Sequence, residues 1–295
     1  MRIGIDIGGT KIESVAIDAD LTVLATSRTP VRSGPEGITT GAIEAVDDLM
    51  RTAACPVDSI GIGVPGAIRR GVVQHARNIS IESLDLEAAV AAATGVPVRV
   101  ANDVNAAALG AWRLCGSGSS AFAYLNLGTG MAAGLVLDGH LWEGARGLAG
   151  EIGYISVDPH GPDHVDGLAG LLEAYASGSG VIAQWEVDGA TAVDVFSAAA
   201  AGDPRAAAIR DGVFFGAASA VRVLALAYDA DSVVIGGGLT GLGQELHDGM
   251  AAYFEAWSEA SPFIASLELG RITRVMHDER PVHAIGAAIL GGSRG

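Results

Sequence analysis

The order of apolar and polar positions predicts short buried strands that alternate with amphipathic helices. In the first part of the chain, apolar runs bounded by turn residues predict strands at 2–7, 12–16, 21–27, 59–64 and 98–101. Helical spacing of apolar residues predicts helices at 37–53, at 84–94 with Gly95 as its cap, and from Asp103 to about Trp112. This alternation predicts a layered α/β sheet that starts with an antiparallel meander.

The strand pattern of the first residues returns later in the chain. Strands are predicted at 121–127, 131–137 and 140–143, with a glycine turn after the first and Asp138-Gly139 as a hairpin. Two such copies, about 120 residues apart, predict a duplicated fold with a central cleft. Further predicted elements are helices at 167–176, 190–202, 205–228 and 285–290 and a strand at 232–235. We predict an N-terminal domain of residues 1–114, joined by the C-terminal helix 282–295, and a C-terminal domain of residues 115–281.

Composition and charge narrow the function classes. Of 295 residues, 49% are hydrophobic and 18% charged, which is typical of a folded globular protein. A net charge of −16, from 18 basic and 34 acidic residues, disfavours binding to nucleic acid or to a membrane surface. The two cysteines, Cys55 and Cys115, are too few for a disulfide scaffold. With no membrane span or signal peptide in evidence, we expect a soluble cytoplasmic protein.

Two glycine turns after predicted strands are candidates for binding phosphate. The first consists of Asp6, Gly8, Gly9, Thr10 and Lys11, in which glycine amides and a hydroxyl can approach phosphate oxygens and Asp6 can hold Mg²⁺ through water. Its spacing is not that of a Walker A loop, and an ordinary glycine hairpin with a solvated Asp is the alternative.

The second turn, Gly128, Thr129 and Gly130, repeats this chemistry at the matching place of the second half. Together the two turns could hold a polyphosphate from both sides. Gly237 and Gly238, after the strand at 232–235, offer a third turn where a nucleoside could lie against the backbone, although such turns are common.

Asn102 and Asp103 follow a strand and open a helix, at the edge of the sheet where α/β folds bind ligands. A carboxylate there could act on a bound ligand. The alternative is that Asp103 is an N-cap of the helix, and it could serve both purposes.

The ordered set of motifs resembles the ROK family of sugar kinases, within the actin-like ATPase superfamily, over nearly the whole chain. The motifs are 6–11, 65–66, 102–110, 127–134, 148–153, 172–178 and 236–238. The resemblance implies a two-domain, ribonuclease H-like duplicated fold, an ATP- and Mg²⁺-dependent kinase acting on O6 of glucose or a related hexose, and a homodimer. It makes Asp103 the base that orients the sugar hydroxyl and accepts its proton. It also implies sugar contacts from Asn78, Asn102, Asp103, Glu151, Tyr154 and Glu173, although Glu173 taken alone fits a solvated helix face.

The chain departs from the family where many members bind a structural zinc. Tyr154 stands in place of a histidine that binds sugar and zinc, and no cysteine occurs in the region from His160 to Leu171. His160, His164, Asp158 and Asp166 could form a harder metal site, but solvated loop residues are the favoured interpretation, and we predict no structural zinc. The remaining histidines show no metal spacing and receive no role; they are His75, His140, His247, His277 and His283.

Several alternatives stay open or are disfavoured. Tyr154 weakens the assignment of glucose, so an amino or N-acetylated hexose remains an alternative substrate. Polyphosphate remains an alternative donor, although only 18 basic residues are available to form a groove for it. A ROK-type sugar sensor is disfavoured because the first strand begins at residue 2, which leaves no room for a DNA-binding domain. An inactive sugar-binding relative is disfavoured by the presence of Asp6, Asp103 and both Gly-Thr turns.

Overall fold

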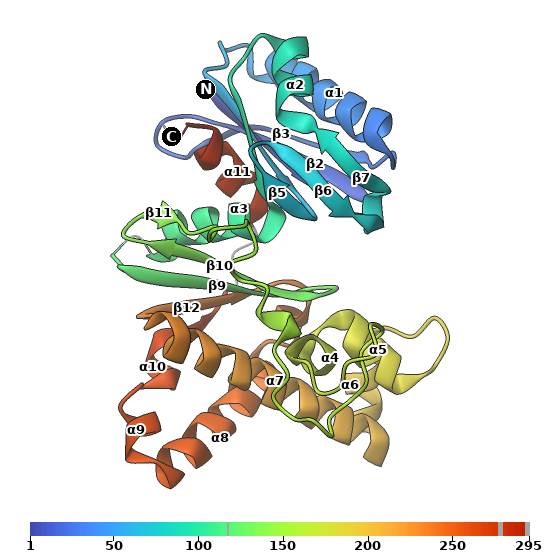
Figure 1. The fold of residues 1–295 in the computed structure, drawn as a ribbon, viewed down its shortest axis with the longest axis vertical. Helices are drawn as coiled ribbons and strands as arrows, with labels where there is room; N and C mark the ends of the chain where they lie inside the picture. Colours follow the sequence, from blue (N-terminus) through green and yellow to red (C-terminus); the bar gives the residue numbers. More distant parts are fainter. Residues whose placement is uncertain (117, 277–279, 293–295) are drawn as a thin grey trace. The chain divides into compact units, whose positions relative to one another are not determined.

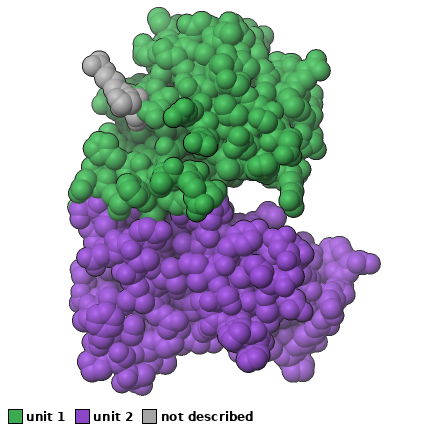
Figure 2. Space-filling view, in the orientation of Figure 1, with its two compact units in different colours: residues 1–118, 134–149, 278–295 green, residues 119–133, 150–277 purple. Residues whose placement is uncertain are grey.

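The computed structural model describes residues 1–116, 118–276 and 280–292. Its contacts divide the chain into two compact units, shown in green and purple in Figure 2. Unit 1 comprises residues 1–118, 134–149 and 278–295, and unit 2 comprises residues 119–133 and 150–277. Residues 134–149 thus group with unit 1, whereas the sequence placed them in the C-terminal domain; the predicted domain boundaries stay a prediction.

Unit 1 contains a five-stranded sheet and a small second sheet. The order of the first sheet is β3-β2-β1-β4-β8, with β1 antiparallel to β2 and parallel to β4, and β4 parallel to β8. The small sheet, β5-β6-β7, was not predicted. The elements of the unit are β1 (Arg2–Ile7), β2 (Lys11–Ile17), β3 (Val23–Pro30), α1 (Pro35–Ala53), β4 (Ser59–Val64), β5 (Ala67–Arg69), β6 (Val72–Ala76), η1 (Arg77–Ile79), β7 (Ile81–Asp85), α2 (Leu86–Thr94), β8 (Val98–Asn102), α3 (Asp103–Ala111), η2 (Trp112–Gly116), β11 (His140–Leu141) and α11 (Val282–Gly292).

Side chains alternate between the two faces of β1, which assigns each face a different partner. Ile3, Ile5 and Ile7 are fully buried in a core that includes Ile38 and Leu49 of α1. The opposite face carries Gly4 and Asp6, and α11 and α3 pack there (Figure 1). The strand therefore presents one carboxylate on the face that α11 covers.

Glycine makes the contact with α11 possible. A Cβ built at Gly4 would overlap the carbonyl oxygen of Ala284, and one built at Gly61 of β4 would overlap that of Ala287. The helix can therefore lie on the strand backbone itself, closer than any side chain would allow.

Unit 2 contains β9, β12 and β13 of a further five-stranded sheet, whose order is β11-β10-β9-β12-β13, with β12 parallel to both β9 and β13. Strand β10 (Met131–Leu137) begins in unit 2 and ends in unit 1, where it pairs with β11. The other elements of unit 2 are β9 (Ala121–Leu127), η3 (Ile152–Tyr154), α4 (Leu172–Ala176), α5 (Gly178–Trp185), α6 (Ala192–Ala200), α7 (Pro204–Tyr228), β12 (Ser232–Gly236), η4 (Gly238–Leu242), α8 (Gln244–Ala260), α9 (Pro262–Ala265), α10 (Leu269–Ile272) and β13 (Thr273–Val275).

Two observations correct or qualify the sequence predictions here. The helix predicted over 167–176 is wrong before Leu172, because Gly167 and Gly170 have φ of +77° and +64°, which end helical geometry. Helix α7 is, in the part of the chain that is described, the one helix long and apolar enough to cross a membrane; 56% of its apolar window is buried, as in a core helix. His277 lies outside the described residues.

We expect that Gly61→Ala destabilises unit 1 by about 1–3 kcal/mol or more, because its methyl group meets backbone that can move only with the whole of α11. The measurement is the midpoint of thermal unfolding. Gly270→Ala in α10 is the matched control: its Cβ would face open space, so we expect no loss and a gain of up to about 1 kcal/mol from helix propensity. Equal midpoints for the two variants would contradict the packing argument.

Candidate active site

Two carboxylates meet at the carboxyl ends of the parallel strands of unit 1. Asp6 is the second-last residue of β1, and Asp103 follows β8. The strand between them is β4, whose Gly63 pairs with Asp6 and with Ala101. A Cβ at Gly63 would lie 3.7 Å from Asp6 Oδ1 and 3.4 Å from Asp103 Cα. Glycine on the middle strand therefore allows Ala106 of α3 to pack closely there, where a Cβ would lie 3.2 Å from Ala106 Cβ, and both acids lie near this position.

Burial gives both carboxylates a raised pKa. For Asp6, desolvation is the largest cause and the charge of Glu13 the next, and together they raise its pKa to about 7. Desolvation also raises the pKa of Asp103, and the charge of Asp6 adds to the increase, while His283 opposes it. Two partly desolvated carboxylates repel each other when both are ionised, so binding of a proton or a cation at this pair is favoured.

Asp103 is the first residue of α3 and is not its cap. The side chain of Asn102 caps the helix, accepting from the amides of Val104 at 2.9 Å and Asn105 at 3.3 Å. The N-cap role considered for Asp103 is therefore wrong, although its Oδ1 accepts from the Val104 amide at 3.0 Å. Asn102 also donates to the carbonyl oxygen of Gly66 at 3.3 Å, which ties the cap to the Pro65-Gly66 turn.

His283 is a residue of this site that the sequence analysis missed. It lies on α11, and its Nδ1 is 3.9 Å from Asp6 Oδ1. Desolvation lowers the pKa of the imidazole, while the charges of Asp103 and Glu13 favour its protonated form. No local motif could reveal it, because its position depends on the packing of α11 across β1 and β4.

The first glycine turn closes on itself. The amide of Gly8 donates to the carbonyl oxygen of Lys11 at 2.9 Å, and Lys11 forms an ion pair with Glu13 at 3.1 Å. Gly9 and Thr10 are exposed, and a Cβ at Gly9 would lie 3.8 Å from Asn78 Nδ2. Unit 1 thus brings Asn78 beside the turn that begins with Gly8.

The second turn, in unit 2, is also closed by an internal hydrogen bond but is one residue shorter. The amide of Gly128 donates to the carbonyl oxygen of Gly130 at 3.0 Å, and the carbonyl oxygen of Thr129 accepts from the amide and the hydroxyl of Ser179 in α5. Gly237, with φ +92°, lies directly against the end of β9, where a Cβ would meet the Leu127 carbonyl carbon at 2.5 Å. Gly238, the next residue, faces open space. The structure brings these glycines of unit 2 together.

Glu173 of α4 is tied to the second turn and is not on a solvated face. Its Oε2 accepts from the amide of Met131 at 2.7 Å, and its Oε1 lies 3.1 Å from His164 Nε2. Its side chain is 20% exposed, and a Cβ at Gly130 would lie 2.7 Å from Oε2. The interpretation of Glu173 as a residue on a solvated helix face is therefore wrong.

Glu151 precedes the short helix η3 and Tyr154 is its last residue; both are exposed. Their segment is held to β10 because the Ala133 amide donates to the carbonyl oxygen of Gly150 at 2.8 Å. The hydroxyl of Tyr154 donates to Asp166 at 2.9 Å, and this hydrogen bond raises the pKa of Tyr154.

The residues considered for a zinc site do not converge. Asp158 accepts from the hydroxyl of Tyr175 at 3.1 Å and from the backbone of His160, whereas His164 faces Glu173 and Asp166. Among the described residues, no group of three or more His, Cys, Asp or Glu side chains could hold a metal ion. Residues 154–171 do not fit a structural zinc.

Mg²⁺ needs fewer protein ligands than a structural zinc ion, because one carboxylate together with waters and nucleotide phosphates can hold it. Asp6 fits that role: it is a largely desolvated carboxylate at a strand end, beside a second acid.

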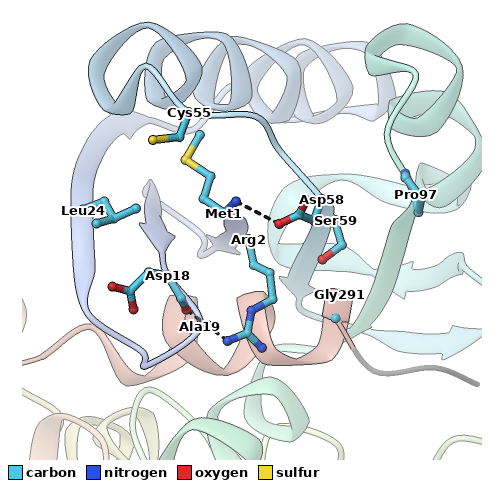
Figure 3. A pocket seen from close by; sticks show the side chains of 11 residues that line it. Met1, Arg2, Asp18, Ala19, Leu24, Cys55, Asp58, Ser59, Pro97 and Gly291 are labelled. Carbon is cyan, nitrogen blue, oxygen red and sulfur yellow. Dashed lines mark hydrogen bonds and ion pairs between the residues drawn. The ribbon is translucent and has the colours of Figure 1, made fainter.

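A cavity of about 940 Å³ lies elsewhere in unit 1, at the amino ends of β1 and β4 (Figure 3). Met1, Arg2 and Ser59 line it, and the amino group of Met1 pairs with Asp58 at 2.9 Å. It lies at the opposite end of β1 from Asp6, and no predicted site residue borders it.

Comparisons with known proteins agree over nearly the whole chain. A family model described as "ROK family" matches residues 2–291. The chain is 32% identical to a glucokinase of Halalkalibacterium halodurans, covering 98% of this chain and 93% of that protein. It is 30% identical to an N-acetylmannosamine kinase of Citrobacter koseri, covering 98% and 97%. A Streptomyces griseus ROK family glucokinase, solved with glucose and AMPPNP, superimposes with a TM-score of 0.77 at 29% identity, covering 98% of both chains.

The raised pKa of Asp6 predicts that stability falls as pH rises. The folded protein keeps the Asp6 proton up to about pH 7, whereas the unfolded chain releases it near its ordinary pKa of 3.8, so the folded state binds more protons between these values. Without Mg²⁺, the temperature midpoint of unfolding should therefore be lower at pH 8 than at pH 5.5. Asp6→Asn should flatten that drop and stabilise the protein at pH 8, by an upper bound of about 4 kcal/mol.

The matched control is Asp47→Asn, which removes an exposed carboxylate on α1. Its pH profile should follow that of the wild type. A profile of Asp6→Asn as steep as that of the wild type would contradict the assigned desolvation.

Proposed function

Because the family model matches nearly its whole length, the protein belongs to the ROK family and has the two-domain actin-like ATPase fold of these kinases, and we propose that it transfers the γ-phosphoryl group of ATP to O6 of a hexose, with glucose as the first candidate. The predicted family and fold class are thus confirmed. The kinase names of its relatives support sugar phosphorylation at the level of the family.

The observation that carries the proposal is the desolvated Asp103 beside Asp6. A sugar hydroxyl becomes a nucleophile when a carboxylate orients it and accepts its proton as the bond to phosphorus forms. A carboxylate whose pKa is raised by burial is a better proton acceptor than a solvated one. We assign the role of base to Asp103, with Asn102 fixing the first turn of α3 that carries it.

The nucleotide side of the proposal rests on the glycine turns. In each turn the first glycine amide is already used within the turn, so a phosphate would be met by the positions that follow: Gly9, Thr10 and Lys11 in unit 1, and Thr129 and Gly130 in unit 2. The nucleoside would lie against the backbone of Gly237 and Gly238. Asp6 would hold Mg²⁺ through water, and the ion, when bound, neutralises charge on the phosphates.

For the sugar, we propose contacts from Asn78, Asn102, Glu151, Tyr154 and Glu173. Amide and carboxylate groups of this kind discriminate between patterns of hydroxyl groups, because a mismatch leaves buried polar groups unpaired. An N-acetylated hexose is the second candidate, supported by the similarity to an N-acetylmannosamine kinase and by the hydroxyl of Tyr154, which is already bonded to Asp166. We also expect a cytoplasmic homodimer.

The experiment that tests the function is a coupled ADP-release assay with ATP and Mg²⁺ against glucose, mannose, fructose, N-acetylglucosamine and N-acetylmannosamine. The highest kcat/KM with glucose supports the first candidate, and the highest with an N-acetyl sugar supports the second. A failure to release ADP with every sugar, together with product formation from polyphosphate, would replace ATP as the donor. No product with either donor would favour the inactive sugar-binding relative.

We predict that Asp103→Asn lowers kcat by about 10²- to 10⁴-fold, the usual contribution of a general base, and changes sugar affinity only a few-fold. The amide keeps the size of the side chain but cannot accept the proton. The measurements are kcat from ADP release and the sugar Kd from calorimetry, with the unfolding midpoint to show that the variant is folded. A variant that retains more than about a tenth of the wild-type kcat would contradict the assignment of the base.

A further inference from the structure

A continuous set of polar contacts runs through unit 2 from Tyr154 to the start of β10. The Tyr154 hydroxyl donates to the Asp166 carboxylate at 2.9 Å, and the Asp166 amide donates to His164 Nδ1 at 3.3 Å. His164 Nε2 lies 3.1 Å from Glu173 Oε1, and Glu173 Oε2 accepts from the Met131 amide at 2.7 Å. The contacts thus link the loop at 158–171 to the turn at 128–130.

The position of the ring proton follows from these partners. A backbone amide can only donate, so Nδ1 of His164 accepts at that contact and the proton of the neutral ring sits on Nε2. The Asp166 carboxylate, 3.5 Å from Nδ1, is already the acceptor of the Tyr154 proton. Nε2–H therefore points at Glu173. An ionised carboxylate has no hydrogen to donate, so Glu173 is the acceptor in this contact.

Because His164 is largely buried, its contact with Glu173 restricts the orientation of the Glu173 carboxylate. The side chain of His164 is 9% exposed, and its ring packs edge-on against that of Tyr154, with centroids 5.7 Å apart. With one oxygen held by His164 and the other by the Met131 amide, Glu173 has a fixed rotamer, and its remaining lone pairs can still accept from a ligand hydroxyl.

We propose that His164 is a positioning residue: its Nε2–H holds Glu173 in the orientation that receives the sugar, and hydrogen bonds through Tyr154 and Asp166 support it in a loop that has no metal-ligand set. The sugar-binding part of this inference rests on the proposed function, whereas the His164–Glu173 contact does not. The loop segment that carries His164 thereby acts on sugar specificity without touching the reacting atoms.

The kinetic test compares His164→Leu with His164→Gln. Leucine fills the space but leaves Glu173 Oε1 unpaired, so we expect the sugar KM to rise by about 10- to 100-fold, the usual effect of a lost hydrogen bond to a charged group. The KM for ATP should change much less, because the Met131 contact remains. Glutamine offers an amide N–H to Oε1 and should recover most of the sugar affinity, which a purely structural role for the ring would not explain.

The matched control is His160→Leu, in the same loop, where the histidine is exposed and only its backbone contacts Asp158. We expect wild-type kinetics for this variant. A sugar KM unchanged in folded His164→Leu, or raised equally in His160→Leu, would overturn the proposal while leaving the kinase function standing.

A second measurement does not depend on activity. Long-range ¹H–¹⁵N NMR spectra of the seven histidines, assigned by the signal lost in His164→Gln, report which ring nitrogen carries the proton. We expect Nε2–H for His164 in the wild type, before and after treatment with EDTA. A proton on Nδ1 alone, or a change of the His164 signals when EDTA removes a bound metal, would overturn the proposal even if no sugar is phosphorylated.

Discussion

The close packing of α11 on bare strand backbone is the constraint on which the arrangement of unit 1 depends. Without side chains at Gly4 and Gly61, the helix lies directly on β1 and β4, and its own Gly286 allows the same approach to α3. This brings residues from the two ends of the chain together. Asp6 and Asp103 therefore both lie near Gly63, and His283 of the C-terminal helix lies near Asp6.

Such packing desolvates the two acids, and desolvation has opposite effects on stability and on chemistry. A raised pKa means that the ionised protein carries unfavourable free energy at neutral pH, which a bound cation would reduce. The same burial increases the basicity of Asp103. A solvated carboxylate in this position would cost less stability and would be the weaker base.

Much of the fold and part of the site could be predicted from the sequence because they depend on local patterns. Strand β1 and the strand over 121–127 follow from apolar runs that end in glycine, and Asp103 follows from a strand that meets a helix. The small sheet β5-β6-β7 could not be predicted, because its short strands lack a clear alternation and depend on mutual pairing. Nor could the cap be assigned: Asn102 and Asp103 are both good caps, and only their backbone geometry separates them.

From the sequence, His164 is considered only as a metal ligand and interpreted as a solvated loop residue, and His283 is given no role. A sequence shows metal spacing or a catalytic motif; His283 belongs to neither, and the loop residues grouped with His164 do not converge on a metal site. Each acts through a carboxylate on another element: His164 meets Glu173 of α4, nine residues further along the chain, and His283 meets Asp6 of β1, near the other end of the chain. An acid at the end of a strand or in a helix is recognisable from its neighbours in the chain, whereas the group that holds or tunes it is selected by tertiary packing. Sequence reasoning is therefore stronger at finding candidate acids than at finding the residues that set their orientation and charge.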